Sequence, residues 1–531
     1  MNSDRKTARV LDAAGDSLTA TVGKNTFYGI IASLFQVGTR LVTVPIIIYH
    51  LGLGGYGIWS IIMTAAIYMR FGSAGVKSAF QKYVAEATGN GDYEKASQLL
   101  STGTATMAAL SVAGLIPVVI FSRQLAQAAG VPPEFLQDAA WAFSVLGLTM
   151  VFSNGGAAYE AIVLGGQRID VARKINTVLT VAEAVAIIAL LHIGRGLFAM
   201  ACVMAASELI YLVCCYAVAH RVVPEVQVRV KHITRSVVRE LMRFAGSYQL
   251  LNILYITYGA IVPIVLLRAY GADAAGVYAV ASRLAGPVSM CHNAFLLPIL
   301  SGGAMVYASG QTDRLQRLLT KSFKVTLALT LMPLALISIF GTYMVQAWTG
   351  RTDASFHFAI WLVCLALFFQ SFSILALVLY RAAGGAVMDN VFQAIRLAAF
   401  VPVLFMAHRI GFEGILGWMA GSEFVGMILM VLVLEKSFHA FRVKMLASDA
   451  LRLSVATGAI VAFAALAVYA VPNGISGDRI LAIIKVGVVC LAALVATYPA
   501  LYLTGSISGA EVRSIRNIFR RSPGTALPSV Q

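Results

Sequence analysis

Ionisable side chains inside long apolar stretches are the residues of this chain best suited to chemistry. The basic ones are Arg40, Arg70, Arg283 and Arg396. A charged group at the centre of a bilayer costs roughly 2.5–3.5 kcal/mol on insertion scales, so it usually faces a cavity or a partner. The guanidinium fork binds two phosphate oxygens at once. We therefore expect these arginines to face a polar interior, where they have the chemistry to bind an anionic group. The alternative is pairing with an acidic residue or extension to the membrane surface.

Acidic side chains occupy the same kind of stretch at Glu183, Glu208 and Glu423. Two carboxylates close together in low dielectric hinder each other's ionisation, which suits a site that couples transport to H⁺ or Na⁺. An ion pair with Arg40 explains Glu183 and Glu208 equally well.

Motifs for metals, cofactors and nucleotides do not match. The stretch GSAGVKS at 72–78 has Val76 where a phosphate loop requires Gly, and the histidines form no H-E-x-x-H. The six cysteines form no C-x-x-C. We expect no cofactor and no metal.

The composition indicates a membrane protein. Hydrophobic residues make up 59% of the 531 residues, charged residues 12%, and the mean hydropathy is +0.81. Soluble domains are about one quarter charged, whereas ~20 apolar residues cross the hydrocarbon core as a helix. We therefore predict an all-α polytopic membrane protein of about fourteen spans. They lie near 26–49, 56–77, 99–121, 138–164, 174–193, 197–219, 244–267, 275–301, 322–348, 356–380, 388–408, 412–434, 451–471 and 480–504.

Lysine and arginine residues in the loops and at the adjoining span ends concentrate on one side of the membrane. On one side of the membrane they number 29, and on the other 6. Cytoplasmic loops carry the excess of Lys and Arg, so both termini are expected in the cytoplasm. Contact of these loops with anionic lipid headgroups explains the net charge of +16, and no nucleic-acid partner is needed.

An internal repeat divides the chain. VPIIIYHLGLGGYGIW at 44–59 resembles VPIVLLRAYGADAAGVY at 262–278, and each next helix begins at a glycine, Gly57 or Gly276. The copies lie six spans apart and so share one orientation, which predicts two parallel six-helix lobes and two added C-terminal helices. The basic stretch between the lobes, with Arg235, Arg239 and Arg243 every four residues, is expected to be a short amphipathic helix or a solvated loop.

The expected organisation follows from these boundaries. It comprises a cytoplasmic segment at 1–25, an N-lobe at 26–219, a basic amphipathic linker at 220–243, a C-lobe at 244–436, two further spans at 451–504 and a cytoplasmic tail at 505–531.

The start of the chain resembles a known family. The order of a proline in the first span, LGLGGYGIW, and FGSAGVKSAFQKYVAEATGNGDYEKASQLLST at 71–102 is similar to Wzx-type oligosaccharide-lipid flippases. These belong to the multidrug/oligosaccharidyl-lipid/polysaccharide exporter superfamily. The matching positions are Gly52, Tyr56, Gly57, Phe71, Gly72, Gly91, Asp92, Tyr93 and Ala96.

The resemblance implies a transporter, not an enzyme, whose central cavity opens alternately to each side. It implies that an undecaprenyl-diphosphate-linked oligosaccharide is flipped across the bacterial inner membrane for exopolysaccharide or O-antigen biosynthesis. The implied partners are this substrate, membrane lipids, a polysaccharide polymerase and a chain-length regulator. The arginines would then contact the diphosphate, and sugar contacts are expected from Tyr68, Tyr248, Gln249, Asn252, Tyr255, Tyr258 and Gln370.

Three other functions stay open. A lipid II flippase would share the fold and the headgroup chemistry. A cation-coupled multidrug exporter is disfavoured because buried arginines repel cationic ligands. A membrane polysaccharide polymerase would need a polar loop with clustered carboxylates or histidines, and the stretch after Phe121 holds only Glu134 and Asp138.

Overall fold

The computed structural model of the protein describes most of the chain between residues 35 and 437. The described ranges are 35–66, 92–165, 168–222, 224–226, 228–310, 312–351, 353–382 and 387–437, with isolated positions between 452 and 495. Within these ranges every regular element is a helix. Eight of the described helices are long and apolar enough to cross a membrane. The prediction of an all-α polytopic membrane protein is confirmed.

Most helices coincide with one predicted span, but Phe35–Ala66 contains parts of two, 26–49 and 56–77, and the turn predicted between them is marked inside it by Gly52 with φ 72°. The first described helix is Phe35–Ala66. It is followed by α3 (Tyr93–Ile120), α4 (Ser122–Ala129), α5 (Pro133–Gly165), α6 (Ile169–His192), α7 (Leu197–Val222), the short 3₁₀ turn η1 (Val230–His232), α8 (Arg235–Tyr270), α9 (Ala272–Ala308), α10 (Thr312–Thr349), α11 (Ser355–Ala382) and α12 (Val387–Ser437).

Glycines with positive φ separate spans that otherwise run together. Gly411 has φ 77° and ψ 166° inside α12, so this segment consists of two helices that meet at a sharp break. Gly271, between α8 and α9, has φ 86° and ψ −179°. Such angles are essentially restricted to glycine, because a Cβ would clash with the backbone. The predicted boundary between spans 388–408 and 412–434 coincides with the break at Gly411.

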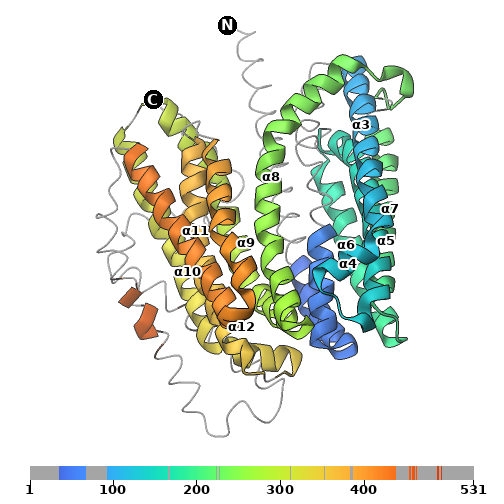
Figure 1. The fold of residues 1–531 in the computed structure, drawn as a ribbon. Coiled ribbons are helices and arrows are strands. Elements are labelled where there is room, and N and C mark those ends of the chain that lie inside the picture. Colours follow the sequence, from blue (N-terminus) through green and yellow to red (C-terminus); the bar gives the residue numbers. More distant parts are fainter. Residues whose placement is uncertain are drawn as a thin grey trace.

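The described helices form two bundles (Figure 1). The N-lobe contains Phe35–Ala66 and α3 to α7, and the C-lobe contains α8 to α12. Each lobe has its own apolar core, one built around Leu100, Met107 and Ala158, the other around Leu319, Leu375 and Phe392. A third and larger cluster joins the lobes.

The linker expected at 220–243 is not a separate helix. The chain leaves α7 at Val222, passes through η1, and enters α8 at Arg235, which continues without interruption to Tyr270. The loop is fixed to α3, because Thr102 Oγ1 accepts a hydrogen bond from the backbone N–H of Thr234 at 3.0 Å. The amphipathic pattern therefore marks the first turns of a long helix. These turns lie on the N-lobe, since Val237 packs against its core, while the end of α8 belongs to the C-lobe.

Some predicted segments lie outside the described residues. These are the two terminal tails, the second half of the span 56–77 with the following loop, and nearly all of 451–504.

Candidate functional site

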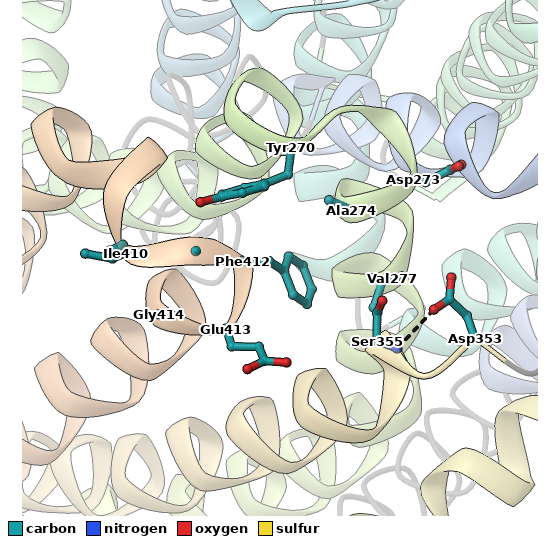
Figure 2. Close-up of a pocket in the computed structure, with 11 residues that line it drawn as sticks. Tyr270, Asp273, Ala274, Val277, Asp353, Ser355, Ile410, Phe412, Glu413 and Gly414 are labelled. Atoms are coloured by element: carbon teal, nitrogen blue, oxygen red, sulfur yellow. Dashed lines mark hydrogen bonds between the residues drawn. The ribbon is translucent and has the colours of Figure 1, made fainter.

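The C-lobe has a pocket of about 570 Å³ at the end where α8, α10 and the first half of α12 finish (Figure 2). Three carboxylates line it, and each stands at the start of a helix. Asp273 is in the first turn of α9, Glu413 follows the break at Gly411, and Asp353 Oδ1 accepts from the Ser355 N–H at 3.0 Å. Acidic groups at helix N-termini are stabilised by the free N–H groups and the helix dipole. Their positions at helix N-termini account for these three carboxylates.

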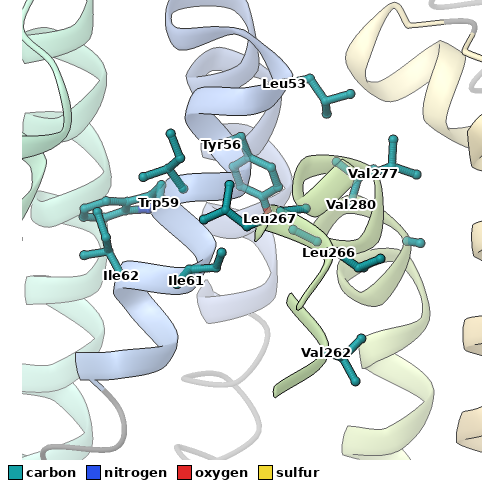
Figure 3. Packing of buried hydrophobic residues seen from close by; sticks show 14 of the residues in the cluster. Leu53, Tyr56, Trp59, Ile61, Ile62, Val262, Leu266, Leu267, Val277 and Val280 are labelled. Atoms are coloured by element: carbon teal, nitrogen blue, oxygen red, sulfur yellow. The ribbon is translucent and has the colours of Figure 1, made fainter. Parts of the chain in front are cut away.

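The two lobes meet at a seam formed by the repeated segments (Figure 3). Buried side chains of the first helix, Tyr56, Trp59 and Ile62 among them, pack in one cluster with Leu266 of α8 and Val280 of α9. Burial of this apolar surface holds the lobes together at the end where Gly52 and Gly271 lie.

Glycines let the backbones approach closely at this seam. A Cβ added to Gly276 would lie 2.3 Å from the Leu53 carbonyl oxygen, and one added to Gly57 would lie 2.5 Å from the Ala272 oxygen. These two glycines are the repeat-related pair that the sequence singled out. The seam is thus built symmetrically from both copies of the repeat, and it tolerates no side chain at either position in this conformation.

A proline contributes to the same contact between lobes. Pro45 has no N–H, so the carbonyl of Leu41, one turn earlier, loses its partner within the helix. The indole Nε1 of Trp348, at the end of α10, donates to that carbonyl oxygen at 2.6 Å. A backbone group released by the N-lobe proline is therefore satisfied by the C-lobe.

A second hollow, of about 490 Å³, lies between the lobes beyond the seam. The N-lobe contributes Ser60 and Thr64, and α8, α9, α11 and α12 contribute the rest. Among the described residues, the charged ones in its lining are Arg283, Arg396 and Glu423, two cations and one anion. The remaining lining residues are Tyr258, Gly259, Val262, Pro263, Tyr278, Ala279, Ser282, Gly286, Val363, Ala366, Leu367, Gln370 and Met419. The charge of this cavity favours an anionic ligand.

Arg396 and Glu423 form a buried ion pair in the cavity wall, each only 2% exposed. They stand on the two halves of α12, about 22 Å before and about 18 Å after the break at Gly411 at 1.5 Å per residue. The antiparallel halves bring them together at mid-depth. Glu423 Oε1 accepts from the Arg396 guanidinium and, at 3.3 Å, from Gln370 Nε2 of α11.

Aromatic rings and an amide hold the Arg396 guanidinium from its other sides. Its Cζ lies 4.0 Å from the centroid of the Tyr258 ring and 5.1 Å from that of Phe392. Its Nη1 donates to Gln393 Oε1 at 2.9 Å. The Tyr258 hydroxyl is hydrogen-bonded to Ser422 at 2.9 Å, which fixes the ring. Cation–π contacts of this kind strengthen when they are desolvated, so the cation is also held by groups other than Glu423.

The other cation, Arg283, has a different environment. It projects from α9 as an exposed side chain and lines the cavity next to the Tyr56 hydroxyl. Within the described ranges, no carboxylate pairs with Arg283. Its positive charge is therefore available to a ligand.

The structure does not place Arg40 among the described lining residues of this cavity, and its role in binding stays a prediction. Arg40 is exposed on the first helix. It is close enough to Glu183 of α6, and to Arg283, for their charges to interact. The insertion penalty does not specify which group an intramembrane arginine meets, so it cannot separate Arg40 from the arginines of the cavity.

The remaining predicted residues are dispersed. Glu183 and Glu208 are partly buried on the neighbouring helices α6 and α7, and they do not join Glu423 in the cavity. Arg70 and Tyr68 lie outside the described residues, and Tyr248, Gln249, Asn252 and Tyr255 fall in the stretch of α8 whose side chains the structure does not describe. Of the expected sugar contacts, Tyr258 and Gln370 line the cavity.

Four polar lining residues were not predicted from the sequence: Ser60, Thr64, Tyr278 and Ser282. The repeat held a signal for one of them. Aligning Gly57 with Gly276 places Thr64 at the position of Arg283, and both line the cavity from opposite lobes.

Comparison with known proteins agrees with this architecture. Residues 22–304 match the protein family described as "Polysaccharide biosynthesis protein". No curated protein matches the chain.

Several solved structures share the fold. The lipid II flippase MurJ in an inward closed conformation superposes with a TM-score of 0.70 at 13% identity, covering 93% of this chain and 100% of its own. An inward-facing multidrug resistance transporter of the MATE family superposes with a TM-score of 0.66 at 14% identity, covering 76% of this chain and 95% of its own. A transporter of the MOP superfamily from Pyrococcus furiosus superposes with a TM-score of 0.56 at 15% identity, covering 80% of this chain and 95% of its own. At these identities the likeness is one of fold.

Proposed function

Because the chain belongs to the family of polysaccharide biosynthesis proteins, we propose that it is a flippase. It moves an undecaprenyl-diphosphate-linked oligosaccharide from the inner to the outer leaflet of the bacterial inner membrane, for exopolysaccharide or O-antigen biosynthesis. It works by alternating access, catalyses no bond change, and keeps both termini in the cytoplasm.

The observation that carries the proposal is the Arg283 side chain in the cavity between the lobes, with no carboxylate partner among the described residues. A diphosphate bridge bears two negative charges and must leave the headgroup layer to cross. Its desolvation is offset when arginines bind its oxygens bidentately in a low-dielectric site. Arg283 and Arg396 line one cavity and supply two such forks.

The polar lining fits the remainder of the substrate. Hydroxyls of Ser60, Thr64 and Tyr278 and the amide of Gln370 share the cavity with the arginines. Sugars are recognised by hydroxyl and amide groups and by stacking on aromatic rings. A cationic drug would instead meet a net positive wall, so the multidrug reading is disfavoured.

The conformation supports alternating access. The positive-inside rule puts the end with Gly52 and Gly271 on the external side. There the lobes are closed by the glycine seam, in which the backbones of Leu53 and Gly276 are in contact. Opening this seam while the opposite side closes would transfer the diphosphate between leaflets.

Deleting the gene in its native bacterium tests the proposal. We expect loss of surface polysaccharide and accumulation of lipid-linked repeat units in the inner leaflet, because these units no longer reach the polymerisation machinery at the outer leaflet. Wild type should restore the polymer, Arg283→Ala should not, and Arg195→Ala, an exposed residue between α6 and α7, should restore it fully. Surface polysaccharide and extracted lipid intermediates are measured.

Other outcomes would point elsewhere. Normal polysaccharide in the deletion strain would exclude the proposed role. Loss of viability with accumulated lipid II would reassign the substrate to the peptidoglycan precursor.

A further inference from the structure

Arg396, one of the two cavity cations, is occupied by an internal anion in this structure. Its partner Glu423 lines the same cavity, so a bound diphosphate would reach the same guanidinium. We propose that Glu423 is the internal competitor of the substrate: it holds Arg396 while the cavity is empty, the diphosphate displaces it, and the displaced carboxylate takes up one proton. This inference rests on the proposed flippase function.

The ion pair is only partly satisfied, which makes exchange feasible. Oε1 of Glu423 receives hydrogen bonds from Arg396 and Gln370, whereas Oε2 is buried without a hydrogen-bond partner in the described part of the chain. A buried charged oxygen that lacks partners carries a desolvation penalty. The pair is therefore less stable than its burial alone suggests.

The guanidinium is also held by groups other than Glu423. Stacking on Tyr258 and the hydrogen bond to Gln393 keep it at the cavity wall. When the carboxylate is displaced, the cation stays where a phosphate oxygen can reach it. Arg396 thus serves two anions in turn.

When the diphosphate displaces the Glu423 carboxylate from Arg396, the carboxylate binds a proton. A buried carboxylate that has lost its cation is strongly destabilised relative to its neutral form. One proton passes from solution to an oxygen of Glu423, and no other bond forms or breaks. Because ligand binding and proton binding are then linked, each must strengthen the other.

Among the described residues that line the cavity, Glu423 is the one group that can take up this proton near neutral pH. The titratable or charged groups around it are Arg396 on α12, Tyr258 on α8 and Tyr278 on α9, with Arg283 in the same lining; Gln370 on α11 is uncharged. Tyrosine ordinarily titrates near pH 10 and arginine above 12. Among the described lining residues, only Glu423 is a carboxylic acid.

The test measures binding of an undecaprenyl-diphosphate-linked sugar to the full-length protein in lipid nanodiscs between pH 5.5 and 8.0. This probe is a diphosphate diester, so it lacks the terminal phosphate group that titrates near pH 6. For wild type we expect the affinity to rise by up to about tenfold for each unit fall in pH, the limit for uptake of one proton. Glu423→Gln should bind with the same affinity at every pH, at least as tightly as wild type at pH 5.5.

A matched control sits on the same helix. Glu413→Gln removes a carboxylate from the C-lobe pocket that Asp273 and Asp353 also line, and it should leave the wild-type pH dependence of binding intact. A second measurement needs no variant: binding to wild type in weakly buffered solution should take up about one proton per lipid.

The outcomes separate this inference from the function it rests on. Failure of wild type to bind the probe at any pH would overturn the flippase proposal. Binding that is independent of pH, or a pH dependence that persists in Glu423→Gln, would leave the flippase standing and refute the exchange. Binding that depends on Na⁺ without proton uptake would refute it as well.

Discussion

Replacing Arg396 with alanine is expected to abolish transport and to destabilise the C-lobe by about 3–5 kcal/mol, the usual result of leaving one member of a buried ion pair unpaired. The substitution removes a cation from the cavity and strands the Glu423 carboxylate, which is 2% exposed. Polysaccharide export in the deletion strain measures the first effect, and thermal unfolding of the purified protein measures the second.

The double variant Arg396→Ala/Glu423→Ala separates the two roles of the pair. In the double variant no buried carboxylate is left without its cation. The thermal stability of the protein should therefore recover in large part, while transport remains lost. Arg381→Ala is the matched control, because Arg381 pairs with Asp389 in the same lobe but outside the cavity, and its side chain is 40% exposed. Recovery of transport in the double variant would show that Arg396 serves only the fold.

Introducing a side chain at Gly276 is expected to prevent closure of the external seam. A Cβ there would stand 2.3 Å from the Leu53 carbonyl oxygen and 2.8 Å from Leu53 Cγ, so one lobe must move away from the other. With Gly276→Val we expect transport to fall at least tenfold and the population to shift toward the outward-open state. Reaction of a cysteine placed at Ser60 with an impermeant maleimide added from outside should become at least tenfold faster.

Gly302→Ala provides the comparison for this variant. Gly302 lies on the same helix α9, and a Cβ there would meet nothing within 4 Å. It should transport like wild type and leave the cysteine slow to react. Equal protection of the cysteine in Gly276→Val would contradict the role assigned to the seam.

Much of the fold could be predicted from the sequence, because a helix in lipid must satisfy its own backbone. The apolar runs located the helices, and the repeat located the turns at Gly52 and Gly271, but the next helices do not begin at Gly57 and Gly276: α9 begins at Ala272, and Gly57 lies inside Phe35–Ala66. The end of the linker helix could not be found in this way. Its four-residue period shows that a helix begins near Arg235, but the next proline is Pro263, so nothing local ends the helix before the membrane span.

The site was less predictable than the fold. The insertion penalty singled out Arg283 and Arg396, and it equally singled out Arg40, which is exposed outside the cavity lining. Glu423 was expected, like Glu183 and Glu208, to couple transport to an ion. Its pairing with Arg396 depends on how the two halves of α12 rotate about the break at Gly411, a tertiary property that no spacing rule expresses.

The most direct test of the central claim is transport by the purified protein in liposomes. A fluorescent undecaprenyl-diphosphate-linked oligosaccharide is incorporated into both leaflets, and an impermeant quencher reports how much of it becomes accessible from outside. We predict that wild type exposes the inner-leaflet pool, whereas Arg283→Ala and Arg396→Ala leave it protected as in protein-free liposomes. An inner pool that stays protected with wild type, or becomes equally accessible with both variants, would contradict the account.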